Sequence, residues 1–317
     1  MNFPFFRLLF LFIIFSIFST CKTSPSHPII GILTQPTTNY PDFGKVYVPS
    51  SYVKWIEASG GKAVYIDYQL SHSELEQLFN KVNGLVFIGG GLDIDPHIKY
   101  IDSAWYLFNL TKQAYDKHNE WVPIWGTCLG FQMLSVFSTG DLDFLDRFDS
   151  WDMALPLNFT TQLKESRIFK GIPSSYLNYF QKYNVTINWH TYGVTSGYQT
   201  KHKESFQKYS SFFRIVSNNS GRKGKNFVST IESYRYPIYG SQWHPECVNY
   251  GGGEHVAVDY PRAVSCSSYV GQFFINEARK NSHSFGSLEN AWDLLFLNKC
   301  PIFDKNLFSS YESVYFW

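Results

Sequence analysis

The chain has 317 residues, of which 44% are hydrophobic, so it can bury a sizeable core in one large domain or two small ones. Its 27 basic and 26 acidic side chains leave a formal net charge of +1. This balance lacks the strong positive field by which proteins gather nucleic acid or anionic membranes, and we therefore expect no nucleic-acid partner.

The N-terminus has the pattern of a secretory signal peptide. Arg7 supplies one positive charge, an apolar run extends from Leu8 to Phe18, and small or polar residues follow. This run is shorter than the roughly 20 apolar residues that a membrane-spanning helix needs. We therefore expect residues 1–24 to be a removed signal peptide and residues 25–317 to be secreted or delivered to a lysosome or vacuole, without stable membrane insertion. An uncleaved signal anchor is the alternative, and it would bury Arg7 in the membrane.

Export through the secretory pathway predicts glycosylation. The sequence contains four acceptor motifs of the form N-x-S/T. Their asparagines are Asn109, Asn158, Asn184 and Asn218. Because such motifs also arise by chance, they support the export prediction together and not singly.

Short apolar strands alternate with helices in the first half of the chain. The strands are predicted at 28–33, 63–66, 84–88 and 122–125, and the helices at 47–59, 73–81 and 104–120, with Ser71 and Ser73 as candidate N-caps. This alternation predicts βαβ units and a mostly parallel sheet covered on both faces. Later runs at 227–232 and 238–243 predict antiparallel strands, and 264–280 predicts a closing helix. We therefore expect one α/β domain, with its core at about 28–285 and an aromatic tail at 286–317.

The strongest chemical motif is Gly126-Thr127-Cys128-Leu129-Gly130, which follows a predicted strand and begins a predicted helix. The pattern G-x-C-x-G is that of a nucleophile elbow, in which small residues allow a strained turn that holds the sulfur above the sheet edge. The helix N-terminus favours the thiolate, and the Leu129 N–H faces a developing oxyanion. Alone, the motif is equally compatible with a buried cysteine at an ordinary strand-to-helix turn.

A second motif, Trp243-His244-Pro245-Glu246, follows another apolar strand and supplies the partners that a nucleophilic thiol needs. An imidazole assists thiolate formation, and a carboxylate fixes the tautomer of that imidazole. A single histidine would more often be a surface or core residue. In combination with the elbow, the motif predicts Cys128 as nucleophile, His244 as base and Glu246 as the group that orients it.

Glycines at 89–91 follow the predicted strand at 84–88 and point to an anion site. Exposed backbone N–H groups at such a turn can face an oxyanion, so Gly90 is the candidate for the second donor. A plain tight turn is the alternative. The spacing G-x-G-x-x-G of dinucleotide-binding loops is missing, so we expect no nucleotide cofactor.

Taken in order, the motifs resemble those of the γ-glutamyl hydrolase family within the class I glutamine-amidotransferase-like superfamily. They are PIIGILTQ at 28–35, SYVK at 51–54, GTCLGF at 126–131, PLNFT at 156–160, YGSQWHPE at 239–246 and FINEARK at 274–280. The resemblance implies a flavodoxin-like three-layer α/β sandwich. It also implies hydrolysis of folate poly-γ-glutamates without metal or organic cofactor, a possible homodimer, and substrate-site roles for Tyr52 and His190.

The chain departs from the family pattern at two places near the expected site. Gln132 stands where an acidic residue is usual, and a stretch that begins at Cys247 replaces a charged and aromatic run. If Cys128 is a free nucleophile, at most one disulfide can form among Cys247, Cys266 and Cys300. A bridge between Cys247 and Cys128 would instead inactivate the enzyme.

Two other functions are compatible with these motifs. A glutaminase of the same superfamily would release ammonia from glutamine, although the expected signal peptide argues against the cytosolic partner that such domains serve. A secreted binding glycoprotein could keep the fold and lack catalysis. The reactivity of the Cys128 thiol separates this second alternative from a working enzyme.

Overall fold

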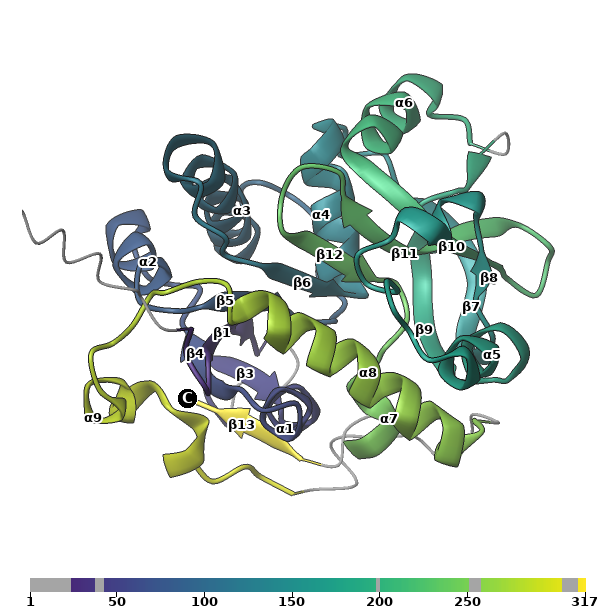
Figure 1. Ribbon diagram of the computed structural model, residues 1–317. Coiled ribbons are helices and arrows are strands. Elements are labelled where there is room, and N and C mark those ends of the chain that lie inside the picture. The colour runs from purple at the N-terminus through teal and green to yellow at the C-terminus, as the bar shows by residue number, and fades with distance from the viewer. Residues whose placement is uncertain (1–23, 38–42, 198–199, 251–257, 304–312) are drawn as a thin grey trace, which may run out of the picture.

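The computed structural model describes residues 24–37, 43–197, 200–250, 258–303 and 313–317 (Figure 1). Residues 1–23 of the predicted signal peptide lie outside this range. No helix in the described part of the chain is both long and apolar enough to cross a membrane.

An eight-stranded sheet forms the centre of the molecule. Its strands, in spatial order, are β4 (Lys62–Ile66), β1 (Ile29–Leu33), β5 (Gly84–Phe87), β6 (Ile124–Thr127), β12 (Ile238–Ser241), β11 (Asn226–Ser233), β10 (Phe213–Ser220) and β8 (Asn158–Phe159). The first five strands are parallel neighbours, and the last three pair antiparallel. Strand β12 therefore joins the two parts, because it runs parallel to β6 and antiparallel to β11. The predicted α/β class, with antiparallel strands in the C-terminal half, is confirmed.

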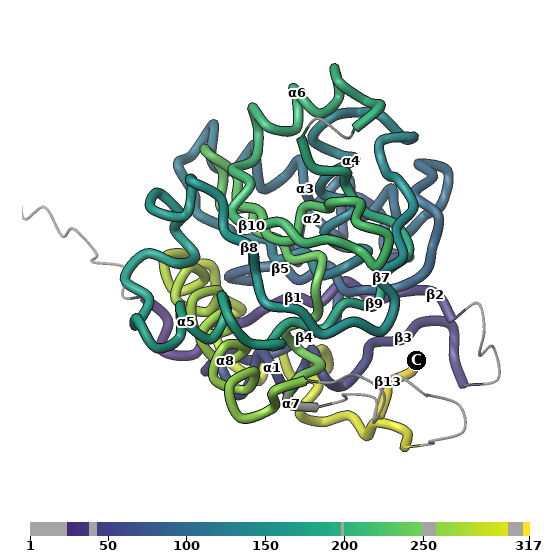
Figure 2. The backbone as a smooth tube through the Cα atoms, turned by 90° about the vertical axis from the view of Figure 1, so that its right-hand side faces the viewer, coloured from purple at the N-terminus to yellow at the C-terminus, as the bar shows by residue number. Residues whose placement is uncertain are grey.

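Helices cover both faces of this sheet, as Figure 2 shows from the side. One layer contains α2 (His72–Phe79), α3 (Lys99–His118), α4 (Leu129–Thr139) and α6 (Lys203–Phe212). The other contains α1 (Ser50–Ala58), α5 (Ser174–Lys182), α7 (Cys247–Tyr250) and α8 (Tyr260–Ala278). Each layer packs its own cluster of buried apolar side chains against the strands, so the core is divided by the sheet. This is the three-layer arrangement expected from the resemblance.

Smaller elements complete the structure at the edges. They are a sheet of β2 (Gln35–Pro36), β3 (Val46–Pro49) and β13 (Val314–Phe316), an antiparallel pair of β7 (Asp146–Leu155) and β9 (Thr186–Gly193), the short helix α9 (Leu288–Ala291) and 3₁₀ turns at Thr161–Glu165, Trp292–Leu294 and Phe296–Asn298. The pair β7/β9 matters for function, because it carries His190 beside the C-terminal ends of β6 and β12.

The helix predicted at 47–59 is wrong in its first turn, where the structure has strand β3. Val46 and Val48 are buried. Strand β3 pairs with β13 on one side and with β2 on the other, so tertiary pairing overrides the helical spacing. Helix α1 begins only after Pro49. Helix α3 begins at Lys99, five residues before the predicted start at 104.

Helix α2 shows the local chemistry that makes one sequence prediction reliable. Ser71 is its N-cap, and the Ser71 hydroxyl accepts the Glu74 N–H while the Glu74 carboxylate accepts the Ser71 N–H. This reciprocal pair satisfies two helix-end donors. Of the two candidate caps, Ser71 is therefore correct, and Ser73 lies inside the helix.

Candidate active site

The central sheet brings the two chemical motifs together. Strands β6 and β12 are parallel neighbours, with Thr127 in register with Ser241, so the residues that follow them emerge at the same edge. The Cys128 N–H donates to the Ser241 carbonyl oxygen at 2.9 Å. Ligands of open α/β sheets bind at such carboxyl edges.

Cys128 has the backbone geometry of an elbow. Its φ of 52° and ψ of −103° are unusual for a residue with a side chain and cost on the order of 1–3 kcal/mol. Close packing explains the flanking glycines, because a Cβ on Gly130 would overlap the Phe87 carbonyl oxygen and one on Gly126 would lie 2.6 Å from Leu134 Cδ1. The thiol is 5% exposed, and its Sγ lies 3.7 Å from the Trp189 carbonyl oxygen.

His244 and Glu246 form a buried hydrogen-bonded pair beside this thiol. The distance from His244 Nδ1 to Glu246 Oε1 is 2.7 Å, and neither side chain is more than 4% exposed. Burial opposes charge on the imidazole, but the Glu246 carboxylate and then Cys128 outweigh it and hold the pKa of His244 well above its usual value. The Nε2 atom of His244 makes no hydrogen bond to any described residue. It is therefore the ring nitrogen available to the Cys128 thiol.

The glycine turn after β5 lies against Cys128, His244 and Tyr52. A Cβ on Gly89 would be 2.8 Å from His244 Cε1, 3.0 Å from Tyr52 Oη and 3.3 Å from Cys128 Cβ. The Gly89 N–H donates to Tyr52 Oη at 2.7 Å. Tyr52 is fully buried. Its hydroxyl therefore positions the glycine turn from inside the protein.

Gln35 holds the other side of the glycine turn, a role that the sequence motifs do not predict. Its Nε2 donates to the Gly89 carbonyl oxygen at 3.0 Å, and a Cβ on Gly90 would overlap its amide. The Gly90 N–H has no hydrogen-bond partner among the described residues, as an oxyanion donor requires. Gly89, the partner of its amide, is 54 residues away in the sequence, so no local signal points to this role.

His190, on β9, is buried close to His244. Its Nδ1 lies 3.0 Å from the Tyr192 carbonyl oxygen and 3.1 Å from Ser150 Oγ, and its Nε2 has no partner in the described part of the chain. Burial, with a smaller contribution from the charge of His244, lowers the pKa of His190 to about 3. A neutral ring with its proton on Nδ1 therefore presents Nε2 as a free acceptor.

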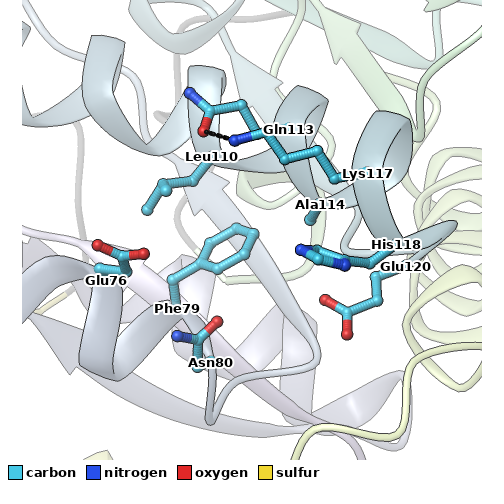
Figure 3. Close-up of a pocket in the computed structure, with 9 residues that line it drawn as sticks. All are labelled: Glu76, Phe79, Asn80, Leu110, Gln113, Ala114, Lys117, His118 and Glu120. Atoms are coloured by element: carbon cyan, nitrogen blue, oxygen red, sulfur yellow. Dashed lines mark hydrogen bonds between the residues drawn. The ribbon is translucent and has the colours of Figure 1, made fainter.

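A surface pocket of about 330 Å³ between α2 and α3 is separate from this cluster (Figure 3). Polar and charged side chains surround it. They include Glu76, Gln113, Lys117, His118 and Glu120. None of its lining residues contacts the cluster around Cys128, and it contains no nucleophile, so we do not assign the active site there.

Comparisons with known proteins identify the family. The family described as Peptidase C26 matches residues 28–246. The chain is 36% identical over 291 residues to gamma-glutamyl hydrolase of Homo sapiens, which covers 91% of this chain and 89% of that protein. This chain belongs to the peptidase C26 family. Gamma-glutamyl hydrolase B of Dictyostelium discoideum is 31% identical over 303 residues, with 94% of this chain and 86% of that protein covered.

The resemblance to γ-glutamyl hydrolases, which the motifs indicated, is confirmed by these matches. Among solved structures, the chain is similar to a glutamine amidotransferase from Thermotoga maritima, at 13% identity and a TM-score of 0.38, over 80% of this chain and 96% of that chain.

Gln132 and Cys247, where this peptidase C26 chain departs from the expected pattern, both make contacts in the site. Gln132 Nε2 donates to the Tyr192 carbonyl oxygen at 2.7 Å and so ties β9 to helix α4. Cys247 Sγ lies 3.2 Å from Glu246 Oε1 and 3.9 Å from His244 Nδ1. Burial raises the pKa of the Cys247 thiol to about 12.

All four cysteines in the described part of the chain are free, and Cys300 alone among them is exposed. Cys247 approaches His244 from Nδ1, whereas Nε2 is left for Cys128. Both thiols are free, so the inactivating bridge considered from the sequence is not formed in this structure.

The four glycosylation candidates differ in accessibility. Asn158 and Asn184 are exposed, whereas Asn109 and Asn218 are partly buried. Asn109 lies within helix α3, where its amide donates to the Trp105 carbonyl oxygen at 3.0 Å. Asn158 and Asn218 are register partners on neighbouring strands, so glycans on both would emerge side by side.

Proposed function

We propose that the chain hydrolyses γ-glutamyl amide bonds through a thiol mechanism. The observation that carries the proposal is the buried 2.7 Å contact between His244 and Glu246, next to Cys128 on a strained turn. Sequence relatives that carry the name gamma-glutamyl hydrolase support the bond type. A glutamine side chain is itself a γ-amide of glutamate, so the chemistry suits the superfamily as well.

The reaction proceeds by acyl transfer to sulfur. The Cys128 thiolate attacks the γ-carbonyl carbon, and the Leu129 and Gly90 N–H groups hold the oxyanion. Protonated His244 gives its Nε2 proton to the departing amine as the C–N bond breaks, which leaves a γ-glutamyl thioester. The neutral ring then removes a proton from water, which attacks the thioester carbonyl. The C–S bond breaks, the γ-carboxyl product leaves, and the Cys128 thiolate and the protonated ring are restored. Glu246 keeps the second ring proton on Nδ1 throughout.

We further propose folate poly-γ-glutamates as the substrates. The aromatic side chains of Trp151 and Tyr192 on the β7/β9 pair are 55% and 46% exposed, and Arg147 lies 5.6 Å above the Tyr192 ring. Aromatic faces can stack on a pterin, and a cation can pair with the α-carboxylates of a glutamate chain. The free Nε2 of His190 gives the site one buried acceptor.

The expected location is outside the cell or in a lysosome or vacuole, reached through the secretory pathway. The signal-peptide pattern and the exposed acceptors Asn158 and Asn184 support this proposal. Expression in a eukaryotic cell, followed by N-terminal sequencing and glycosidase treatment, tests it. Light scattering on the purified protein tests the proposed homodimer.

The deciding experiment is incubation of purified protein with pteroyl-poly-γ-glutamates and identification of the products. We expect hydrolysis by wild type and by Cys300→Ala, in which an exposed thiol is removed, and none by Cys128→Ala. Loss of one glutamate at a time would identify an exo mode. Faster release of ammonia from glutamine than of glutamate from the γ-glutamyl peptide would assign the chain to the glutaminases instead.

A further inference from the structure

Three potential metal ligands lie together on the Nδ1 side of the His244 ring. His244 Nδ1 is 2.7 Å from Glu246 Oε1, which is 3.2 Å from Cys247 Sγ, and the nitrogen and sulfur are 3.9 Å apart. All three residues are buried, and their ligand atoms lie within 4.8 Å of one another. The catalytic mechanism uses His244 and Glu246 and gives no role to Cys247.

The donor set and its spacing suit a divalent cation that prefers nitrogen and sulfur. Imidazole, carboxylate and thiolate are the ligands of tetrahedral Zn²⁺, with bonds of roughly 2.0–2.3 Å. Ligand atoms around such an ion are roughly 3.4–3.6 Å apart, so each observed separation needs to change by about 0.7 Å or less. A water molecule would complete the coordination, as in other sites with three protein ligands.

The pairing of the Glu246 carboxylate is an independent observation that points to a cation. Its Oε1 is shared by His244 and Cys247, while its Oε2 is buried and has no hydrogen-bond partner among the described residues. A buried carboxylate oxygen without a partner is unfavourable, and a bound cation would supply the missing interaction. The ligand cluster and the unpartnered carboxylate oxygen thus both involve Glu246.

We propose that His244, Glu246 and Cys247 bind Zn²⁺ or a chemically similar divalent cation, and that occupancy arrests the hydrolase. Bonds form from the metal to Nδ1, to Sγ and to the Glu246 carboxylate, which binds through both of its oxygens. The N–H bond at Nδ1 and the S–H bond of Cys247 break, and both protons leave to the solvent. The binding rests on the geometry described here, whereas the arrest also rests on the proposed function.

Arrest follows from what the metal does to the imidazole. With the metal on Nδ1, the ring carries its remaining proton on Nε2 and cannot accept another, so it no longer serves as a base. The same Nε2–H belongs to a neutral ring, which is too weak an acid to protonate the departing amine. The ion thus removes both functions of His244 without touching Cys128.

Binding is measured with Co²⁺ as the probe in the Cys128→Ala protein, which cannot hold metal through its nucleophile. After dialysis against a chelator and its removal, titration should give one equivalent of bound Co²⁺ with a thiolate-to-cobalt absorption band. In Cys128→Ala/Cys247→Ala the band should be lost and the dissociation constant should rise at least about tenfold. The matched control, Cys128→Ala/Cys266→Ala, removes another buried thiol and should keep the band. Thermal unfolding verifies that each protein is folded, and Cys247→Ser replaces Cys247→Ala if the latter is not.

The arrest is measured by adding Zn²⁺ to active protein and restoring the rate with EDTA. The rate of each variant is expressed relative to its own rate in EDTA. The Zn²⁺ concentration for half-inhibition should be at least about tenfold higher in Cys247→Ala than in wild type, and unchanged in Cys266→Ala. If Cys128→Ala abolishes the cobalt band, the nucleophile binds the metal and the proposal is wrong. If the metal binds at Cys247 and hydrolysis continues, the arrest is wrong. A wild-type protein without hydrolysis refutes the proposed function, while the cobalt titration still decides the metal site.

Discussion

Replacement of Gly89 by alanine tests the packing on which the active site depends. The added methyl carbon would lie 2.8 Å from His244 Cε1, 3.0 Å from Tyr52 Oη and 3.3 Å from Cys128 Cβ. Non-bonded carbon atoms prefer roughly 3.5–4.0 Å, so the His244 ring has to withdraw by about 0.7–1.2 Å. Because Glu246 holds that ring at 2.7 Å, the displacement also strains the pair that keeps it charged.

The size of the effect follows from this displacement. A misplacement of about 1 Å in a catalytic group costs on the order of 10²-fold, and we expect kcat/KM for a γ-glutamyl substrate to fall by about that factor. Overpacking of the buried turn should lower the free energy of unfolding by roughly 1–3 kcal/mol, which thermal unfolding detects as a fall in Tm of a few degrees.

Gly91→Ala is the matched control, because no atom lies within 4 Å of a Cβ added to Gly91. Its rate should stay within about twofold of wild type, as for other substitutions in open space. The assay compares kcat/KM and Tm of the two variants under identical conditions. Equal activity of Gly89→Ala and Gly91→Ala would refute the argument that the bare Gly89 backbone positions His244.

Three further substitutions test single contacts. Glu246→Gln removes the charge that does most to raise the pKa of His244, so the alkaline limb of the pH–rate profile should move to lower pH. An unmoved limb would contradict this. Tyr52→Phe leaves the buried Gly89 N–H without the Tyr52 hydroxyl. It should lower the free energy of unfolding, measured by denaturant, by about 1–3 kcal/mol, and it should also lower activity. Ser71→Ala removes the cap of α2 and should cost about 0.5–2 kcal/mol in the same measurement, with kcat unchanged, since α2 contributes no residue to the site.

The sequence predicts best those features that depend on neighbouring residues. The elbow at Cys128 requires small residues on both sides, and the pair His244 and Glu246 is separated by one residue, so both motifs are visible locally. The apolar strands β1, β4 and β5 are likewise recognisable from short buried runs. These local signals, taken in order, were sufficient to identify the family.

Contacts between distant segments could not be predicted from such signals. Strand β3 resembles the start of a helix until β13, more than 250 residues later, pairs with it. Nothing in the local pattern indicates that Gln35 holds the glycine turn, or that the Trp189 carbonyl oxygen faces Cys128. The motifs also do not indicate that the buried Tyr52 hydroxyl accepts the Gly89 N–H.

The position of β12 between β6 and β11 has a consequence for biosynthesis. The nucleophile follows β6, but the imidazole follows β12, and the two strands are joined only through contacts that are distant in the sequence. Such long-range pairing forms late and slowly during folding. A growing or partly folded chain therefore carries Cys128 without its base. The thiol therefore gains its base only when the sheet is complete, so an unfinished chain lacks the assembled catalytic pair.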